Sequence, residues 1–318
     1  MYAIIQKEDK LVWMPTDTPP MKAGCVRIKV RATAVNRADL MQAKGKYPPP
    51  EGVTDILGLE CSGEVMEVAD GVSWPAVGDK VCALLAGGGY AEEVVVPAGQ
   101  VLPIPSNLSL VEAAALPEVF TTAWLNLRLE GELKEGESVL VHAGASGVGT
   151  AAVQLCAAWG NPVVATMGSD KKCERVRALG ATLTINRHNG SWGLKAKEFG
   201  KFDVILDPVG GRYLESNIWH LKPRGRLINI GLLGGNEGTL PLGPVLVKRL
   251  QIKGSVLRSR SVEEKTEIIS GVREEVWPLV ESGMVSPIIH DVMDLKEAEK
   301  AHLEISKNDT IGKILLKI

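Results

Sequence analysis

The chain has few aromatic residues and few cysteines, and neither kind forms a structural framework. Phe, Trp and Tyr together make up 4% of its 318 residues. Its five cysteines are odd in number and widely separated: Cys25, Cys61, Cys82, Cys156 and Cys173. No two have the short spacing of a zinc ribbon or a redox dithiol, so the sequence predicts neither a disulfide framework nor a structural metal. Unpaired cysteines fit a reducing compartment.

Long apolar runs and an excess of one charge are also missing. No apolar stretch approaches the roughly 18 residues of a membrane span, and even residues 111–129 contain Glu112, Glu118 and Arg128. The N-terminus has no basic start followed by an apolar run, which argues against a targeting segment. A formal net charge of −2 gives no general attraction to nucleic acid or anionic lipid. We therefore expect a cytoplasmic protein with no nucleic acid and no membrane among its partners.

The first third of the chain is rich in short strand patterns. Its apolar and polar residues alternate between glycine-containing turns, at residues 25–33, 64–68, 80–84 and 92–96. Such closely spaced strands and turns predict a small, partly open β-barrel. A length of 318 residues exceeds the roughly 100–200 of one domain, so a second domain is expected.

The pattern changes near residue 110, where Ser109 and Glu112 form a capping box at a helix start. Apolar runs then alternate with helical composition. The predicted strands are 138–142, 162–166, 183–185, 203–206, 226–230 and 251–254, with helices at 150–159 and 171–179. This alternation predicts βαβ units and a doubly wound parallel sheet.

The end of the chain carries two amphipathic patterns, at 263–282 and 295–307, and then a strand pattern at 313–318. A lone terminal strand needs a sheet to join, and we expect it to return to the first domain. The predicted domains are therefore 1–113 with 257–318, and 114–256.

A glycine-rich segment follows the strand pattern that ends at His142 and opens the next helix. A dinucleotide fingerprint has glycine at its first, third and sixth positions, so that backbone N–H groups at a helix N-terminus can approach a pyrophosphate. Here those positions are Gly144, Ser146 and Gly149, and Gly147 is an additional glycine. The strand before and the helix after it favour a nucleotide site over a plain tight turn.

The residues after the second strand of this unit indicate which nicotinamide is bound. NAD sites place an acid there to bind the ribose diol, and Met167 occupies that position. Ser169, Lys172 and Arg187 can instead donate to a 2′-phosphate. Asp170 is interpreted as a helix N-cap. The sequence predicts NADPH, although either lysine of the pair at 171–172 could also be an ordinary solvated side chain.

Candidate metal ligands do not converge in the first domain. The histidines all lie at or beyond residue 142: His142, His188, His220, His290 and His302. No His-x-x-x-His or paired-cysteine spacing accompanies them, so no catalytic zinc is predicted.

Several segments, in order along nearly the whole chain, resemble the zinc-independent, zeta-crystallin-type quinone oxidoreductases of the medium-chain dehydrogenase/reductase superfamily. The resemblance is greatest to the tumour-suppressor-inducible quinone oxidoreductase branch. The segments are residues 36–42 (NRADLMQ), 45–50 (GKYPPP), 57–63 (LGLECSG), 83–90, 142–152, 206–211 (LDPVGG), 257–260 (LRSR) and 311–314 (IGKI).

The resemblance implies an α/β fold with two parts. These are a GroES-like, partly open β-barrel catalytic domain and a Rossmann doubly wound parallel-sheet cofactor domain, with a homodimer formed through the Rossmann sheets. Zinc-containing relatives have Cys where this chain has Asn36 and His where it has Leu59, just before Glu60. A metal to polarise an alcohol or aldehyde is therefore not expected.

The resemblance also implies the cofactor-binding residues. Pyrophosphate and nicotinamide contacts fall to Thr122, Gly144, Ser146, Gly147, Val148 and Gly149. The 2′-phosphate set is Gly168, Ser169, Lys172 and Arg187, and the nicotinamide is flanked by Gly231, Leu232, Leu257, Arg258 and Ser259. Arg187 departs from a tyrosine common in the family, which leaves its detailed contact open. Asp309 and Thr310 replace the usual Lys-Asn, so no cofactor role is expected there.

The catalytic residues implied are Asn36, Tyr47 and Ser146, lining a pocket for a quinone or conjugated carbonyl. Tyr47 or Asn36 would donate to the developing oxyanion, and water would supply the proton. Tyr47 could instead be a loop anchor and Asn36 a buried structural amide. Two other functions stay open: a 2-alkenal or enoyl reductase, and an NADPH-binding structural or regulatory protein with little turnover.

Overall fold

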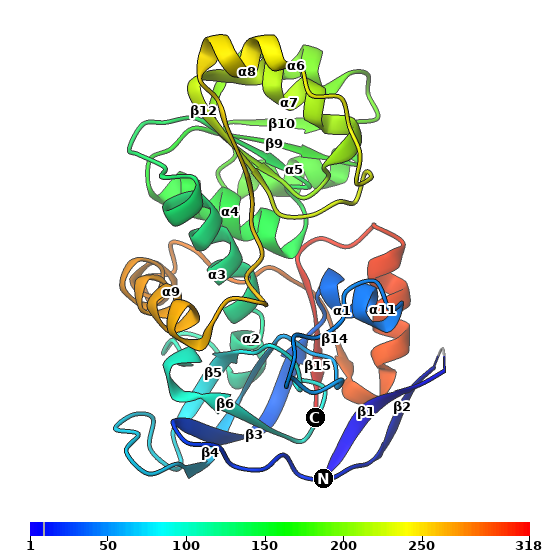
Figure 1. The fold of residues 1–318 in the computed structure, drawn as a ribbon, viewed down its shortest axis with the longest axis vertical. Coiled ribbons are helices and arrows are strands. Elements are labelled where there is room, and N and C mark those ends of the chain that lie inside the picture. Colours follow the sequence, from blue (N-terminus) through cyan, green and yellow to red (C-terminus); the bar gives the residue numbers. More distant parts are fainter. Residues whose placement is uncertain (9) are drawn as a thin grey trace. The chain divides into compact units, whose positions relative to one another are not determined.

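The computed structural model describes residues 1–8 and 10–318 (Figure 1). The chain divides into two compact units, one made of Met1–Thr121 and Leu257–Ile318 and the other of Thr122–Val256. The boundary predicted after residue 113 falls at Thr121 instead. Its physical reason is that Ala114 and Ala115 pack with Ala32 and Ala34 of the first unit.

The first unit is built on a seven-stranded sheet. Its strand order is β14-β15-β3-β4-β5-β7, and β6 pairs with β3. The bounds are β3 Cys25–Ala34, β4 Glu60–Val68, β5 Lys80–Leu84, β6 Glu93–Pro97, β7 Val101–Pro103, β14 Ile289–Asp294 and β15 Lys313–Lys317. A separate hairpin pairs β1 (Tyr2–Lys7) with β2 (Lys10–Pro15). The sequence predicted β3 to β6 and missed β1, β2, β7 and β14.

The helices of this unit lie against the sheet and its loops. They are α1 Arg37–Ala43, α2 Leu110–Ala113, α9 Val262–Glu275, α10 Trp277–Glu281 and α11 Ala298–Ser306, with short turns η1 Ala98–Gln100 and η4 Leu295–Glu297. The helix predicted over 263–282 is two helices, because Pro278 at the start of α10 interrupts it. Helix α1 was not predicted.

The C-terminal strand joins the first unit, as predicted. Strand β15 pairs antiparallel with β3, where Leu315 lies opposite Ala34, and parallel with β14. A strand that is close to the end of the chain therefore completes a sheet that begins at Cys25.

The second unit contains a six-stranded sheet of order β10-β9-β8-β11-β12-β13, and every neighbouring pair is parallel. The bounds are β8 Val139–His142, β9 Val163–Met167, β10 Leu183–Asn186, β11 Phe202–Asp207, β12 Leu221–Asn229 and β13 Gln251–Gly254. All six strands were predicted, although β12 begins earlier than expected. The order reverses between β8 and β11, which is the crevice where doubly wound folds bind ligands.

Helices cover both faces of this sheet (Figure 1). They are α4 Gly147–Ala158, α5 Asp170–Ala178, α6 Trp192–Phe199, α7 Leu214–His220 and α8 Leu242–Lys248, with η3 Gly211–Tyr213. Helix α3 Pro117–Trp124 continues as a π-helical turn, Leu125–Glu130. Leu140, Val164 and Ile205 of three adjacent strands are buried in one core cluster.

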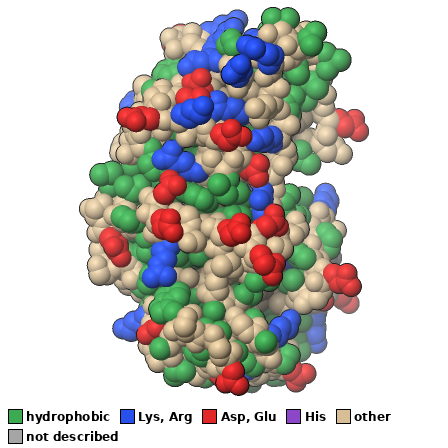
Figure 2. Space-filling view, turned by 60° about the vertical axis from the view of Figure 1, so that its left-hand side comes forward, with side chains coloured by type: hydrophobic (Ala, Val, Ile, Leu, Met, Phe, Trp, Pro, Cys, Tyr) green, Lys and Arg blue, Asp and Glu red, His purple; other side chains and the backbone are tan. Residues whose placement is uncertain are grey.

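The surface of each unit carries both signs of charge (Figure 2). None of the helices in the described parts of the chain has the length and apolar character needed to cross a membrane.

Candidate functional site

The glycine-rich segment forms the turn between β8 and α4. Ser146 is the N-cap of α4, and its Oγ accepts a hydrogen bond of 3.0 Å from the N–H of Gly149. Its hydroxyl hydrogen can still be donated, because Ser146 is exposed. The helix opens with Gly147 and Val148, both half-buried, at the positive end of its dipole. This end of α4 suits an anion such as a pyrophosphate.

Two glycines of the turn are required by close packing. A Cβ placed on Gly149 would lie 2.3 Å from the carbonyl oxygen of Ala143, and one on Gly144 would lie 2.7 Å from the Cβ of Ala165. Both contacts are too short for a real side chain. The glycines therefore bring α4 against the turn and the turn against β9.

Gly168, Ser169 and Arg187, predicted for the 2′-phosphate, lie together at the carboxyl ends of β9 and β10. A Cβ on Gly168 would lie 3.2 Å from Nη1 of Arg187, so the guanidinium covers this glycine. The backbone N–H of Arg187 donates to the carbonyl oxygen of Met167 at 2.9 Å. Arg187 is exposed and Ser169 half-buried, so both can reach a ligand.

The other two charged residues of this region differ from their predicted roles in detail. The N-cap of α5 is Ser169 rather than Asp170. Oδ1 of Asp170 instead accepts from the side-chain amides of Asn186 at 2.9 Å and Asn189 at 3.1 Å. Lys172 is only 8% exposed, because it lies on the buried side of the first turn of α5. Asp170 is thus engaged with the end of β10.

Gly231 and Leu232 follow β12, at the same edge of the sheet. A Cβ on Gly231 would lie 2.9 Å from the carbonyl oxygen of Pro208, so the two loops run close together. Leu232 is 57% exposed. Thr122, the first residue of this unit, is half-buried on α3, and its carbonyl oxygen accepts from Nδ2 of Asn126.

A buried polar chain that the sequence did not predict supports this edge. Nε2 of His142 lies 2.8 Å from Oδ1 of Asn217, whose Nδ2 donates to Oδ2 of Asp207 at 2.9 Å. Oδ1 of Asp207 accepts from the N–H of Val209 and of Gly210. Burial lowers the pKa of His142, so its ring is a neutral structural group. Asp207 belongs to the LDPVGG segment, and its role is to shape the turn after β11.

In the first unit, Asn36 belongs to a closed buried network. Its Nδ2 donates to Oε1 of Glu60 at 2.9 Å, and its Oδ1 accepts from Nζ of Lys313 at 2.6 Å. Lys313 also donates to the carbonyl oxygen of Val35 at 3.0 Å and pairs with Glu60 at 2.8 Å. The second amide hydrogen of Asn36 points to the carbonyl oxygen of Ala34 at 3.3 Å. Asn36 therefore has its hydrogen-bonding groups occupied, as a structural amide would.

The same network is informative about whether the residues around Asn36 and Glu60 could hold a zinc ion. The ammonium of Lys313 is held by the oxygens of Glu60 and Asn36, so a cation already neutralises the donor set. Within residues 1–8 and 10–318, no three His, Cys, Asp or Glu side chains are grouped as metal ligands. The residues present do not fit a catalytic zinc.

Tyr47 lies in the segment after α1 and is half-buried. Its hydroxyl makes no hydrogen bond to a described residue. Burial and the carboxylate of Glu118 raise the pKa of the Tyr47 phenol, and the nearby guanidinium of Arg258 opposes this. The hydroxyl therefore stays protonated near neutral pH and can donate to an acceptor.

Arg258, predicted to flank the nicotinamide, is 5% exposed and bound within the first unit. Its Nε donates to the carbonyl oxygen of Ala86 at 2.7 Å and its Nη2 to Oε1 of Gln42 at 2.7 Å. Its neighbour Leu257 is buried, and Ser259 is exposed. Of this trio, only Ser259 presents its side chain to solvent.

A second buried chain of the first unit joins α1 to α11. The hydroxyl of Tyr90 lies 3.1 Å from Nε2 of His302 and 3.4 Å from Oδ2 of Asp39. Burial raises the pKa of Asp39 to about 6 and lowers that of His302 to about 4. Asp39 also accepts from the N–H groups of Asn36 and Gly58. Asp39 and Asn36 are therefore positioned by each other.

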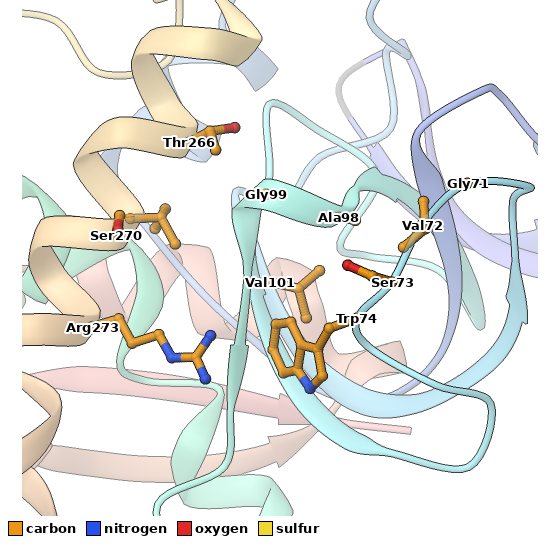
Figure 3. A pocket seen from close by; sticks show the side chains of 11 residues that line it. Gly71, Val72, Ser73, Trp74, Ala98, Gly99, Val101, Thr266, Ser270 and Arg273 are labelled. Atoms are coloured by element: carbon orange, nitrogen blue, oxygen red, sulfur yellow. The ribbon is translucent and has the colours of Figure 1, made fainter.

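An open depression of about 310 Å³ lies elsewhere in this unit (Figure 3). It is bordered by the turn at residues 71–74, by η1 and by α9, and Arg273 lies over the ring of Trp74 at 5.0 Å. None of the predicted site residues lines it.

The fold and these two sets of residues define a class of protein. A parallel sheet with a glycine-rich turn at its switch point, in a chain whose other unit is a seven-stranded sheet with buried polar residues, is typical of a nicotinamide-dependent oxidoreductase.

Comparison with known proteins agrees with this class. Residues 22–106 match the alcohol dehydrogenase GroES-like domain, and residues 147–271 match the zinc-binding dehydrogenase family. The polyketide synthase GfsB of Streptomyces halstedii is 34% identical over 95% of this chain, which spans only 5% of that protein. The human synaptic vesicle membrane protein VAT-1 homolog is 32% identical over 96% of this chain and 82% of its own. The bovine quinone oxidoreductase-like protein 2 is 29% identical over 94% of this chain and 86% of its own.

Three solved structures are similar along the chain. An NAD-dependent alcohol dehydrogenase has a TM-score of 0.86 at 30% identity, with both chains covered over 100%. A quinone oxidoreductase from Thermus thermophilus, solved also with NADPH, has a TM-score of 0.84 at 28% identity, with coverage of 100% and 99%. The CurK enoyl reductase has a TM-score of 0.82 at 28% identity, with coverage of 97% and 95%.

The chain belongs to the medium-chain dehydrogenase/reductase superfamily, and its relatives and structural neighbours include quinone oxidoreductases. The predicted fold class and the predicted resemblance to this superfamily are confirmed.

Proposed function

We propose that the protein is a zinc-independent NADPH:quinone oxidoreductase. The choice of NADPH over NADH rests on the residues at the end of β9. There Met167 replaces the usual acid, and Arg187 covers Gly168 beside Ser169. A guanidinium and a hydroxyl suit a 2′-phosphate better than a ribose diol. NADPH, when bound, supplies a hydride.

The residues of the chain then bind and orient the cofactor and the acceptor. The N-terminus of α4, at Gly147 to Gly149, would take the pyrophosphate. Ser146 and Ser259 are exposed, so their hydroxyls are available to the cofactor. Tyr47 donates a hydrogen bond to the carbonyl oxygen of the acceptor as negative charge develops there. Asn36 is less suited to this role, since its amide is held by Glu60 and Lys313.

Zinc independence is supported by the Lys313 ammonium between Glu60 and Asn36. Without a Lewis acid, an alcohol or aldehyde is a poor substrate, whereas an electron-poor quinone accepts hydride more readily. Alignment of the quinone for hydride transfer and one hydrogen bond from Tyr47 are then sufficient for catalysis.

An enoyl or 2-alkenal reductase is the second candidate, supported by the similarity to the CurK enoyl reductase. The deciding measurement is the rate of NADPH oxidation with a naphthoquinone, a phenanthrenequinone and a 2-alkenal, with and without chelator. Quinone turnover that resists the chelator supports the proposal. Preference for the 2-alkenal favours the reductase, and tight NADPH binding with no turnover favours a structural or regulatory protein.

The role of Tyr47 has its own test. Tyr47→Phe should lower kcat/KM for the quinone by about 10²-fold, as loss of an oxyanion donor does, with little change in the KM for NADPH. An unaltered kcat/KM removes Tyr47 from the mechanism.

We also propose a homodimer formed through the second unit. Strand β13 lies at the end of the six-stranded sheet, and the neighbouring helix α8 buries none of its residues. Leu246 is 78% and Val247 81% exposed, which is unusual for apolar side chains and typical of an interface. The five unpaired, buried cysteines support a reducing, cytoplasmic location.

A further inference from the structure

The segment that carries Tyr47 has no helix or strand of its own. Residues 44–59 connect α1 to β4 without regular structure, and residues 48–50 are three consecutive prolines. A catalytic donor on such a segment needs neighbouring groups to hold it, because a displacement of about 1 Å can cost 10²-fold in rate.

Arg258 contacts this segment at Tyr47 itself. Its Nη1 donates to the carbonyl oxygen of Tyr47 at 3.4 Å, and its guanidinium carbon lies 5.3 Å from the centre of the Tyr47 ring. The planar cation therefore meets both the backbone and the aromatic ring of one residue. Its other donors reach Ala86 and Gln42, which fixes the plane of the guanidinium.

Gln42 connects the same guanidinium to the far side of the segment. Its Oε1 accepts from Arg258, and its Nε2 donates to the carbonyl oxygen of Asp55 at 2.8 Å. Gln42 is in α1, so it offers a rigid anchor. Arg258 and Gln42 thus tie the segment at residue 47 and again at residue 55.

We propose that Arg258 and Gln42 are positioning residues that hold Tyr47 in place for the acceptor, and that Arg258 does not bind the cofactor. This inference rests on the proposed role of Tyr47. It reassigns Arg258 from the nicotinamide to the acceptor side of the reaction. Three of the five N–H groups of this guanidinium have acceptors inside the first unit, and the side chain is only 5% exposed, so little of it is accessible to a ligand.

The test uses the full chain and two readouts. Arg258→Met should speed amide hydrogen exchange across residues 44–56 of the ligand-free protein by about tenfold, because local opening of that segment becomes easier. It should also lower kcat/KM for the quinone by about 10²-fold. The KM for NADPH should stay within about twofold of the wild-type value, since the lost contacts are made to the acceptor side.

Arg258→Lys and Gln42→Glu are milder variants, because each keeps part of the original contacts. Lysine preserves the charge but not the fork of donors, and glutamate keeps an acceptor for Arg258 but cannot donate to Asp55. Both should give intermediate exchange and intermediate rates. Arg31→Met, an exposed arginine of β3 in the same unit, is the matched control and should change neither readout.

The proposal is overturned if Arg258→Met raises the KM for NADPH while exchange of residues 44–56 stays unchanged. It is also overturned if the variant folds normally and keeps wild-type kcat/KM for the quinone. Failure of the wild-type protein to reduce any quinone would refute the proposed function instead, and the exchange measurement would still decide whether Arg258 holds the segment.

Discussion

The ammonium of Lys313 lies 2.8 Å from a carboxylate oxygen of Glu60, and their side chains are 4% and 0% exposed. The second oxygen of Glu60 accepts from the backbone N–H of Glu118 at the start of α3. This pair therefore connects β15 and β4 with the first turn of α3, the part of that helix that belongs to the first unit.

Lys313→Met should be strongly destabilising. It leaves the buried carboxylate of Glu60 without its counter-ion, which costs about 3–5 kcal/mol of unfolding free energy. Urea unfolding followed by circular dichroism measures this loss. The double variant Lys313→Met with Glu60→Gln should recover much of it, because no uncompensated charge remains. Equal stability of the single and double variants would contradict the assignment.

His302 should make stability depend on pH below neutrality. Burial lowers its pKa from 6.5 to about 4, so the folded state favours the neutral ring and the unfolded chain binds the proton first. Stability due to His302 is therefore present above pH 6.5 and is lost as the pH falls toward 4, by up to about 3 kcal/mol.

The neighbouring Asp39, whose raised pKa is about 6, acts in the opposite direction over the same range. The difference between wild type and His302→Gln isolates the histidine, because glutamine keeps a partner for Tyr90. The advantage of wild type over the variant should shrink as the pH falls from 7 to 4. A difference that does not vary with pH would show that His302 is not held neutral.

Gly149→Ala should disrupt the turn before α4. The added Cβ would lie 2.3 Å from the carbonyl oxygen of Ala143, an overpacking that costs about 1–3 kcal/mol, and NADPH affinity should fall with it. Differential scanning calorimetry and fluorescence titration report the two effects. Gly243→Ala in α8, where a Cβ meets nothing within 4 Å, is the control and should gain about 0.5–1 kcal/mol.

Arg187→Ala combined with Lys172→Ala should raise the KM for NADPH by about ten- to a hundred-fold, as loss of charged hydrogen bonds does. The KM for NADH should change little, since NADH has no 2′-phosphate. Initial rates with both cofactors decide this. Equal effects on the two would place the phosphate elsewhere.

Val247→Asp should prevent assembly through the second unit. Val247 is 81% exposed on α8, and a carboxylate buried in an apolar interface is costly. Analytical ultracentrifugation should show a dimer for wild type and a monomer for the variant. Leu303→Asp, at a 60% exposed position of α11, is the matched control and should remain dimeric. A monomeric wild type would rule out the dimer.

The sequence by itself determined the elements that depend on local signals. The capping box of Ser109 and Glu112 starts α2 as predicted. The six strands of the second unit follow from apolar runs between helical segments, and the need for Gly144 and Gly149 was readable from the strand and helix that flank them. These features are readable because caps, turns and apolar runs are patterns of residues that are near one another in the chain.

Only the tertiary structure decided what the individual side chains contact. Asn36 and Lys313 are 277 residues apart, and Arg258 and Gln42 are 216 apart, so no local pattern could pair them. Asn36, a predicted donor, accepts from Lys313, and Arg258, predicted to flank the nicotinamide, donates to the backbone of Tyr47. The physical reason is that β15 and residues 257–260 return to a sheet built much earlier in the chain. Burial there leaves each polar group bound to whichever partner the fold brings within reach.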